Sequence, residues 1–186
     1  RYDVAPLYTH LGGYEDSKSL QGTGRGIYDL NTFTTDEAIM PTRGADWYDG
    51  GFWQGLYTHQ WGVRNTAVLA TWEYLYQVVM LCNRSLERMA LYSEAHPDDE
   101  IDPYVSEVRA LRALFYYHLM DLFGHVPLVL EADPEPGKLV QAKRSELFAF
   151  VERELRESAP FLEEAYSQQP GVYYGRITRS VAHFLL

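Results

Sequence analysis

The chain has 186 residues, and 16 Lys and Arg against 26 Asp and Glu give it a formal net charge of −10. That balance argues against a nucleic-acid binder, which needs a basic face for phosphates. The single cysteine, Cys82, excludes an internal disulfide framework and a multi-cysteine zinc site. No apolar run approaches the ~20 residues that span a bilayer. The closing residues, SVAHFLL, resemble a helix interrupted in mid-course, so we expect this chain to be part of a longer polypeptide.

The first 66 residues are predicted to be rich in loops. Val4, Leu7, Tyr8 and Leu11 indicate a short amphipathic helix within residues 1–12. From residue 12 to residue 51 repeated glycines interrupt any periodicity, which predicts long irregular loops of the kind that are often functional. A short helix is predicted at 52–61, and the helical spacing of its aromatic residues Trp53 and Tyr57 indicates that both lie in the core.

Three long helices follow, at residues 67–91, 102–123 and 145–166, and a fourth begins at Ile177. For the middle helix, we expect Asp102 to cap the first turn, Pro103 to occupy its first position and Gly124 to end it. The inward faces are predicted from helical spacing. They comprise Leu69, Leu75 or Tyr76, and Val79 in the first helix, Val108, Leu111 and Phe115 in the second, and Leu147, Phe148, Val151 and Leu155 in the third.

The order and length of these helices predict an all-α fold. Helices of about twenty residues joined by short connections suit antiparallel pairs stacked as in tetratricopeptide-like repeats, an α-α superhelix. We therefore expect one helical region over 1–186, loop-rich over 1–66 and built of stacked helix pairs over 67–186. Arg112 lies on a largely apolar helix, where a guanidinium is costly unless it is paired. We predict that it is partly buried and bonds a carboxylate or backbone carbonyls.

Motifs for catalysis and for cofactor or metal binding are weak. The glycines at 22–26 lack the preceding apolar strand and the final spacing of a dinucleotide site. No two histidines stand at the i, i+4 spacing of a helical metal site, so we expect no metal and no cofactor. Glycoside hydrolysis needs two carboxylates facing one sugar. The loop carboxylates that leave this reaction open are Asp36, Glu37, Asp46 and Asp49.

The clearest functional signal is a cluster of aromatic residues within 47–61, interleaved with Arg43, Asp46, Asp49 and Asn65. The apolar C–H face of a sugar ring stacks on a flat aromatic side chain, while carboxylate, amide and guanidinium groups bond its hydroxyls. For Trp47 and Trp61, which adjoin turn residues, a role in the core beneath the loops and a role in stacking on a glycan are equally open.

The region around the middle helix resembles the signature of SusD/RagB-like proteins, the surface glycan-binding lipoproteins of Bacteroidetes. The matching residues are Glu107, Arg109, Leu111-Arg112-Ala113, Phe115-Tyr116-Tyr117, Leu119, Leu122-Phe123-Gly124 and Val126-Pro127-Leu128-Val129. Further matches occur in the N-terminal loop, at Asp36-Glu37, Pro41-Thr42-Arg43-Gly44, Asp46-Trp47 and Asp49-Gly50-Gly51. The resemblance covers nearly the whole chain and implies the N-terminal, tetratricopeptide-like part of a larger SusD-like fold.

The resemblance also implies a function. Such proteins have no enzyme activity. They capture oligosaccharides or polysaccharides at the extracellular face of the outer membrane and deliver them to a SusC-like TonB-dependent transporter. They meet the membrane only through a lipid anchor, which is not present in this chain because Cys82 lies within a predicted helix. In the starch-binding prototype an early Asp and Arg and a later Trp and Asn contribute to the glycan site.

The positions that match these prototype residues are Asp36, Arg43, Trp61 and Asn65, and Trp47 joins them through the aromatic cluster. Two other classes stay open at this point. An α/α-barrel glycosidase fragment would hydrolyse oligosaccharides and depend on Asp36 or Asp49. A helical-repeat adaptor would bind a protein or peptide and ignore glycans.

Overall fold

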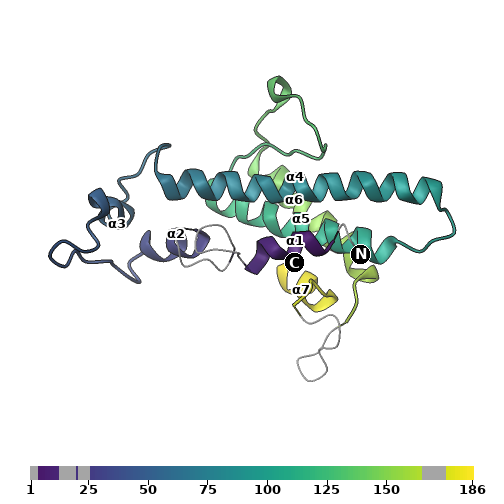
Figure 1. Ribbon diagram of the computed structural model, residues 1–186, viewed down its shortest axis with the longest axis horizontal. Helices are drawn as coiled ribbons and strands as arrows, with labels where there is room; N and C mark the ends of the chain where they lie inside the picture. Colours follow the sequence, from purple (N-terminus) through teal and green to yellow (C-terminus); the bar gives the residue numbers. More distant parts are fainter. Residues whose placement is uncertain (1–3, 13–19, 21–25, 165–174) are drawn as a thin grey trace. The chain divides into compact units, whose positions relative to one another are not determined.

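The computed structural model describes residues 4–12, 20, 26–164 and 175–186, and these residues form helices and loops without a strand. The all-α prediction is therefore confirmed. The α-helices are α1 (Ala5–Gly12), α2 (Ile27–Phe33), α3 (Phe52–Tyr57), α4 (Thr66–Ala95), α5 (Asp102–Phe123), α6 (Arg144–Ser158) and α7 (Arg179–Leu185) (Figure 1). Short 3₁₀ turns occur at Asp49–Gly51, Pro136–Lys138 and Ala159–Phe161. None of the described helices is long and apolar enough to cross a membrane.

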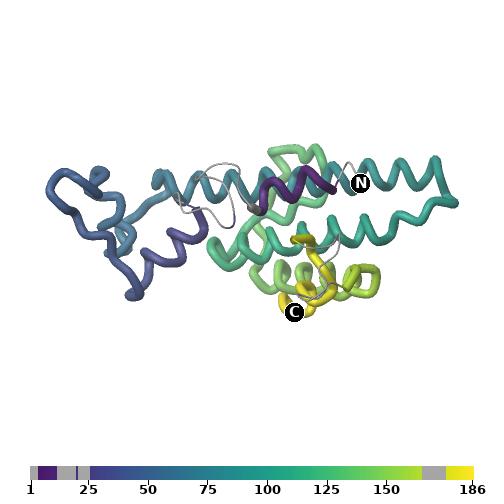
Figure 2. The backbone as a smooth tube through the Cα atoms, turned by 60° about the horizontal axis from the view of Figure 1, so that its bottom comes forward, coloured from purple at the N-terminus to yellow at the C-terminus, as the bar shows by residue number. Residues whose placement is uncertain are grey.

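The chain divides into two compact units. The smaller unit is Thr9–Tyr74, and the larger unit comprises Arg1–Tyr8 with Leu75–Leu186. Within the larger unit the chain reverses direction after α4, so that α5 runs back beside it, and α6 packs against α5 (Figure 2). This arrangement is the antiparallel helix pairing that the helix lengths predict.

Helix α5 is the most deeply buried helix of the larger unit. Val108, Leu111 and Phe115 are at most 1% exposed, which confirms the predicted inward face. The helix begins differently from the prediction, because Ile101 is the N-cap and no side chain caps the turn, so Asp102 is the first helical residue. The Ile101 backbone is already close to helical, with φ −113° and ψ −4°, and its carbonyl accepts the N–H groups of Tyr104 and Val105. Gly124 ends the helix, as predicted. Its φ is +73°, a conformation that glycine adopts without the steric cost that a side chain would bring.

Helices α4 and α6 differ from the prediction at their ends and in part of their faces. Helix α4 extends to Ala95, and its Leu75 and Val79 are buried while Leu69 is 47% exposed. Helix α6 ends at Ser158, because Pro160 lacks the N–H that would continue the helical bonding. Residues 165–166 of the predicted helix lie outside the described residues. On α6 Phe148 is exposed, which contradicts the prediction, and Phe150 is buried in its place.

The smaller unit contains a helix that the sequence did not predict. Residues 27–33 form α2, although glycines precede them and the segment was predicted to be irregular. A compact core joins α2, α3 and the start of α4 through Leu30, Trp53, Leu56 and Ala67, with Phe33, Met40, Phe52 and Val68 packed around it. The glycine-rich stretch at 22–25, considered above as a phosphate loop, lies outside the described residues.

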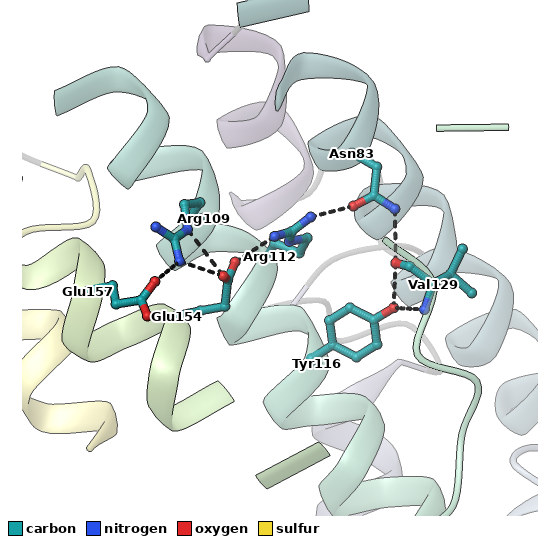
Figure 3. A network of polar contacts seen from close by, with 7 residues as sticks. All are labelled: Asn83, Arg109, Arg112, Tyr116, Val129, Glu154 and Glu157. Carbon is teal, nitrogen blue, oxygen red and sulfur yellow. Dashed lines mark hydrogen bonds and ion pairs between the residues drawn. The ribbon is translucent and has the colours of Figure 1, made fainter. Parts of the chain in front are cut away.

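A network of polar contacts joins the three long helices of the larger unit (Figure 3). Arg112 on α5, which is 8% exposed, donates to Asn83 Oδ1 on α4 at 2.9 Å and to Glu154 Oε2 on α6 at 2.6 Å. Arg109 donates to the other oxygen of the same carboxylate, Glu154 Oε1, at 2.7 Å and also to Glu157 Oε2 at 2.5 Å. The prediction that Arg112 is buried and bonded to a carboxylate is confirmed.

The network continues into the segment after α5. Asn83 Nδ2 donates to the carbonyl oxygen of Val129 at 2.9 Å, and the Tyr116 hydroxyl donates to the same oxygen at 2.8 Å. The Val129 N–H in turn donates to the Tyr116 hydroxyl at 2.7 Å (Figure 3). Burial raises the pKa of the Tyr116 hydroxyl, so it stays protonated and keeps its donor. The segment is therefore held by side chains from two helices and by an isolated antiparallel bridge between Pro127 and Gln141.

We predict that Phe115→Ala lowers the free energy of unfolding by ~3–5 kcal/mol, because the side chain is fully buried and its loss leaves a cavity. Phe148→Ala is the matched control, since Phe148 is 57% exposed and its loss should change stability by under about 0.5 kcal/mol. Denaturant titrations followed by circular dichroism measure both values. A loss below ~1 kcal/mol for Phe115→Ala would contradict the assigned core.

A second prediction concerns the network. Arg112→Ala leaves the buried Glu154 carboxylate without the buried one of its two arginine partners, and we expect the free energy of unfolding to fall by about 3 kcal/mol or more. The control is Arg156→Ala on α6, which removes an exposed pair with Glu152 and should cost under about 1 kcal/mol.

Cys82 supplies a second readout for the same variants. Burial raises the pKa of its thiol to about 12, so it reacts with thiol reagents only when the surrounding helices open. Labelling in dilute buffer should therefore be faster in Arg112→Ala than in the parent or in Arg156→Ala. Equal labelling rates in all three proteins would show that the network does not hold the helices together.

Candidate functional site

The five residues predicted to contact a glycan all lie in the smaller unit. Asp36 and Arg43 are exposed on the segment between α2 and α3. Trp47 and Trp61 are 49% and 41% exposed, whereas Asn65, just before α4, is half-buried. Both tryptophan side chains are thus partly exposed to solvent, and their role as ligand groups stays a prediction.

Trp47 rests on the buried core of the unit. Its ring meets the ring of Trp53 edge-on, with the centroids 6.1 Å apart. Trp53 is 5% exposed, and its indole Nε1 donates to Asp49 Oδ2 at 2.7 Å. Phe33 and Phe52 also pack edge-on against Trp53, with centroids 5.1 Å and 5.0 Å away. Trp53 is therefore core, as predicted, and it supports the exposed ring of Trp47 from beneath.

Trp61 is supported by a second contact with the same unit. Its ring lies beside the His59 ring, with centroids 5.2 Å apart. His59 Nε2 lies 2.7 Å from the carbonyl oxygen of Thr34, the residue that follows α2. Because a carbonyl oxygen only accepts, His59 carries its proton on Nε2. Both exposed tryptophans are thus tied to the C-terminal end of α2, through Trp53 and Phe33 on one side and through His59 and Thr34 on the other.

The backbone of these loops adopts uncommon conformations. Trp47, Asp49 and His59 have φ of +61°, +43° and +57°, in the left-handed region that residues other than glycine seldom enter. Each such residue costs on the order of 1–3 kcal/mol and persists only where the surroundings determine it. Asp49 is determined by its bond to Trp53, and His59 by its bond to Thr34. Such conformations concentrate at ligand-binding loops, which favours this unit as the functional site.

Asn65 has a structural role that the sequence did not predict. Its Oδ1 accepts the backbone N–H groups of Ala67 at 3.0 Å and of Val68 at 3.2 Å. These are bonds of a helix N-cap, and they satisfy donors that are otherwise free at the start of α4. The pattern of an asparagine immediately before an apolar helix could have shown it. Only its amide Nδ2 is left to donate to a ligand.

Arg43 and Asp46 shape the turn that presents Trp47. Their backbones exchange two hydrogen bonds of 3.0 Å each, and Gly44 between them has φ +63°. Gln54 on α3 donates to Thr42 Oγ1 at 2.5 Å and connects this turn to the helix. The exposed side chain of Arg43 extends from a turn that is closed by its own backbone, so its substitution should not disturb the turn.

Two further aromatic residues join the candidate site. Tyr48 is 57% exposed and was not predicted as a ligand group, although it adjoins Trp47 in an aspartate-rich turn. Tyr57 was predicted to be core, but it is 41% exposed, because α3 ends at this residue and the inward face stops at Leu56. We call Trp47, Tyr48, Tyr57 and Trp61 the exposed aromatic set. Their flat faces, with nearby carboxylates and a guanidinium, are the chemistry that a sugar ring requires.

Comparison with known proteins agrees with this chemistry. A SusD-like family model with the description "Starch-binding associating with outer membrane" matches residues 24–186. No curated protein matches the chain.

Solved structures also match. A laminarin-binding SusD-like protein is 25% identical, with a TM-score of 0.73, and the match covers 99% of this chain and 37% of that protein. A SusD homologue from Bacteroides thetaiotaomicron is 23% identical with a TM-score of 0.75, and 99% of this chain covers 34% of it. Surface glycan-binding protein A from Bacteroides uniformis is 21% identical with a TM-score of 0.75, over 99% of this chain and 39% of that one.

The chain therefore spans between a third and two-fifths of the length of these structures. The two below 25% identity show that the fold is shared. The family model covers most of the chain, and the resemblance around α5 is confirmed. The chain belongs to the SusD-like family, whose members bind carbohydrates and associate with the outer membrane.

Proposed function

We propose that this protein binds an oligosaccharide through the exposed aromatic set and does not cleave it. The observation that carries the proposal is the support beneath Trp47 and Trp61. Each is exposed, yet each rests on a neighbouring ring that is itself hydrogen-bonded. A ring held in this way loses little freedom when a sugar stacks on it, so less of the binding energy is lost to ordering.

Polar groups on the same loops would complete the site. Asp36 can accept hydroxyl protons, while Arg43 and the Nδ2 of Asn65 can donate to sugar oxygens. The laminarin-binding neighbour supports a polysaccharide as the source of the ligand. In this proposal residues 1–66 form the glycan-facing region, and residues 67–186 form the stacked helix pairs.

Binding without hydrolysis is supported by the structural role of one of the loop carboxylates, Asp49. A glycosidase needs two carboxyl groups free to face one glycosidic bond. Asp49 is instead engaged by the indole N–H of Trp53, where it supports the aromatic set. The SusD-like relatives are carbohydrate-binding proteins, which agrees with a binding role.

We also propose that the captured glycan passes to a SusC-like TonB-dependent transporter at the extracellular face of the outer membrane. In this proposal a lipid anchor outside the present sequence holds the protein there. The stacked helices of the larger unit supply rigid faces of the kind that helical repeats offer to protein partners. Affinity-tagged protein isolated from detergent-solubilised membranes should retain the transporter, and a stable protein isolated without any outer-membrane barrel would contradict this part.

The third prediction concerns the aromatic set. Trp47→Ala or Trp61→Ala should weaken binding at least several-fold, since a stacked ring contributes about 0.5–1.5 kcal/mol beyond its area burial. Isothermal titration of the full-length protein against plant and host glycans, beginning with laminarin, measures the effect. Affinity should be modest, because sugar hydroxyls exchange bonds to water for bonds to protein at little net gain. It should also depend only weakly on salt, because a neutral glycan has no charge to screen.

Two control variants and two further outcomes separate the alternatives. Phe148→Ala removes an exposed aromatic side chain from the larger unit and should leave glycan affinity unchanged. Arg112→Ala should lower stability while its folded fraction binds as the parent does. Release of reducing ends during incubation would instead identify a glycosidase. Unchanged affinity in both tryptophan variants would place the glycan site outside the exposed aromatic set.

A further inference from the structure

The smaller unit, which carries the exposed aromatic set, is acidic. Residues 9–74 contain eight Asp and Glu against four Lys and Arg, which gives the unit a formal net charge of −4 with histidine neutral. This value holds however the individual groups are paired, because every charged residue of the unit is counted. An acidic unit creates a negative potential around its surface, and that potential acts on any charged ligand that approaches.

Carboxylates adjoin the exposed ring of Trp47. Asp46, which is exposed, directly precedes it in the turn that is closed by two backbone bonds between Arg43 and Asp46. Asp49, two residues after Trp47, accepts the indole N–H of Trp53, the ring on which Trp47 rests. Arg43 is the only basic residue between positions 41 and 51 of the sequence. Two carboxylates therefore accompany one guanidinium beside this tryptophan.

The surroundings of Trp61 repeat this pattern. Its ring lies beside His59, whose Nε2 donates to the carbonyl oxygen of Thr34 at 2.7 Å. Residues 36–37, an Asp and a Glu, follow Thr34 closely and are both exposed. Their Cα atoms lie within roughly 11 Å of the Thr34 Cα atom, about the distance over which charges act in dilute salt. Arg64 is the only basic residue between positions 44 and 74 of the sequence, so here too one guanidinium accompanies two carboxylates.

Three of these carboxylates have no structural role in the part of the chain that the structure describes. The side chains of Asp36, Glu37 and Asp46 form no hydrogen bond or ion pair with other described residues. Asp46 contributes to its turn only through its backbone. Neutralising any of the three therefore removes a charge without removing a bond, and the charges are available to act on a ligand.

Glu107 in the larger unit is a carboxylate of the opposite kind. It is 4% exposed and accepts bonds from two nitrogens of Arg176, one of them Nε at 2.7 Å. The hydroxyl of Tyr8 donates to Glu107 Oε1 at 2.5 Å and accepts the Ile177 N–H at 2.8 Å. The hydrogen bond to Glu107 raises the pKa of Arg176 above its usual range, so the pair stays ionised. Glu107 thus stabilises the fold, whereas the exposed carboxylates of the smaller unit do not.

We propose that the exposed aromatic set selects uncharged oligosaccharides and rejects acidic ones, such as chains of uronic acids or sulfated sugars. Asp36, Glu37 and Asp46 are the specificity-determining residues. An anionic group on the ligand would meet like charge beside both tryptophans, and the aromatic face, the negative end of the ring quadrupole, adds to the repulsion. Hydroxyl groups of a neutral sugar can instead donate to the same carboxylates. This selectivity rests on the proposed glycan site and names the class of glycan that the site admits.

Matched probes separate charge from shape. Laminarihexaose and maltohexaose are neutral, and oxidation of their C6 hydroxyl groups to carboxylates gives an acidic form of each with the same backbone. Isothermal titration of the full-length protein measures the affinity for all four probes. Each acidic probe should bind at least about five-fold more weakly than its neutral parent in dilute buffer. Added salt should strengthen binding of the acidic probes and leave the neutral probes nearly unchanged, because salt screens the repulsion.

Charge-neutralising variants locate the source of the selectivity. Glu37→Gln and Asp46→Asn each keep the size and polarity of the side chain and remove one negative charge. Each should strengthen binding of the acidic probes about two-fold, and the double variant about three- to five-fold, while the affinity for the neutral probes changes by less than about two-fold. The matched control is Glu87→Gln, which removes the same charge from an exposed position on α4 in the larger unit. It should leave the ratio of acidic to neutral affinity unchanged, and thermal melts confirm that each variant is folded.

Three results would overturn the selectivity and leave the proposed function standing. The first is acidic probes that bind as tightly as their neutral parents. The second is binding of the acidic probes that weakens with salt, as attraction to Arg43 or Arg64 would produce. The third is a selectivity that the double variant does not change. Binding of none of the four probes, or binding that neither Trp47→Ala nor Trp61→Ala weakens, would instead reject the proposed glycan site, and the selectivity with it.

Discussion

The larger unit depends on one buried guanidinium. Arg112 reaches from α5 to Asn83 on α4 and to Glu154 on α6, so a single side chain joins three helices. A buried charge is costly unless its partners are in place. Removing one partner of a buried ion pair therefore destabilises a fold more than replacing the whole pair with apolar residues does. The geometry therefore penalises any rotation of α6 that would move Glu154 away. Apolar packing alone, which is non-directional, would tolerate several rotations of these helices.

Long periodic segments made most of the helical architecture predictable. Val108, Leu111 and Phe115 repeat at steps of three and four, and all three are buried. The choice between Phe148 and Phe150 on α6 was not predictable, because a phenylalanine at either position fits an amphipathic helix. The neighbouring elements decide it, and Phe150 packs edge-on against Tyr116 of α5, with the ring centroids 5.2 Å apart. Helix α2 was not predicted, because it has only seven residues and the glycines before it indicated a loop. A helix this short is stabilised by tertiary packing, which local sequence does not show.

The candidate site was only partly predictable. For Trp47 and Trp61 the sequence left a core role and a stacking role equally open, and their exposure excludes the core role, while their part in binding stays a prediction. Trp53 and Tyr57 stand four residues apart on one helix face, yet Trp53 is buried and Tyr57 is exposed. This difference in burial depends on where α3 ends, and helix ends are poorly determined by local sequence. The partners of Trp53 and His59 lie four and 25 residues away. The second of these separations exceeds any local pattern, so the support beneath Trp61 could be found only in three dimensions.

The contact between Tyr8 and Ile177 has a consequence for the order of folding. It joins residues 169 positions apart, and the Tyr8 bond to Glu107 spans 99 positions. Closing such long loops costs conformational entropy before any contact between their ends can form. The helical hairpins of the larger unit, in contrast, form between segments that are close in sequence. The hairpins are therefore expected to assemble first and the first helix to dock last. On a ribosome this docking would have to wait until Ile177 had left the exit tunnel. Until then, the apolar side chains of Val4 and Leu7 would lack the surface that buries them in the folded chain.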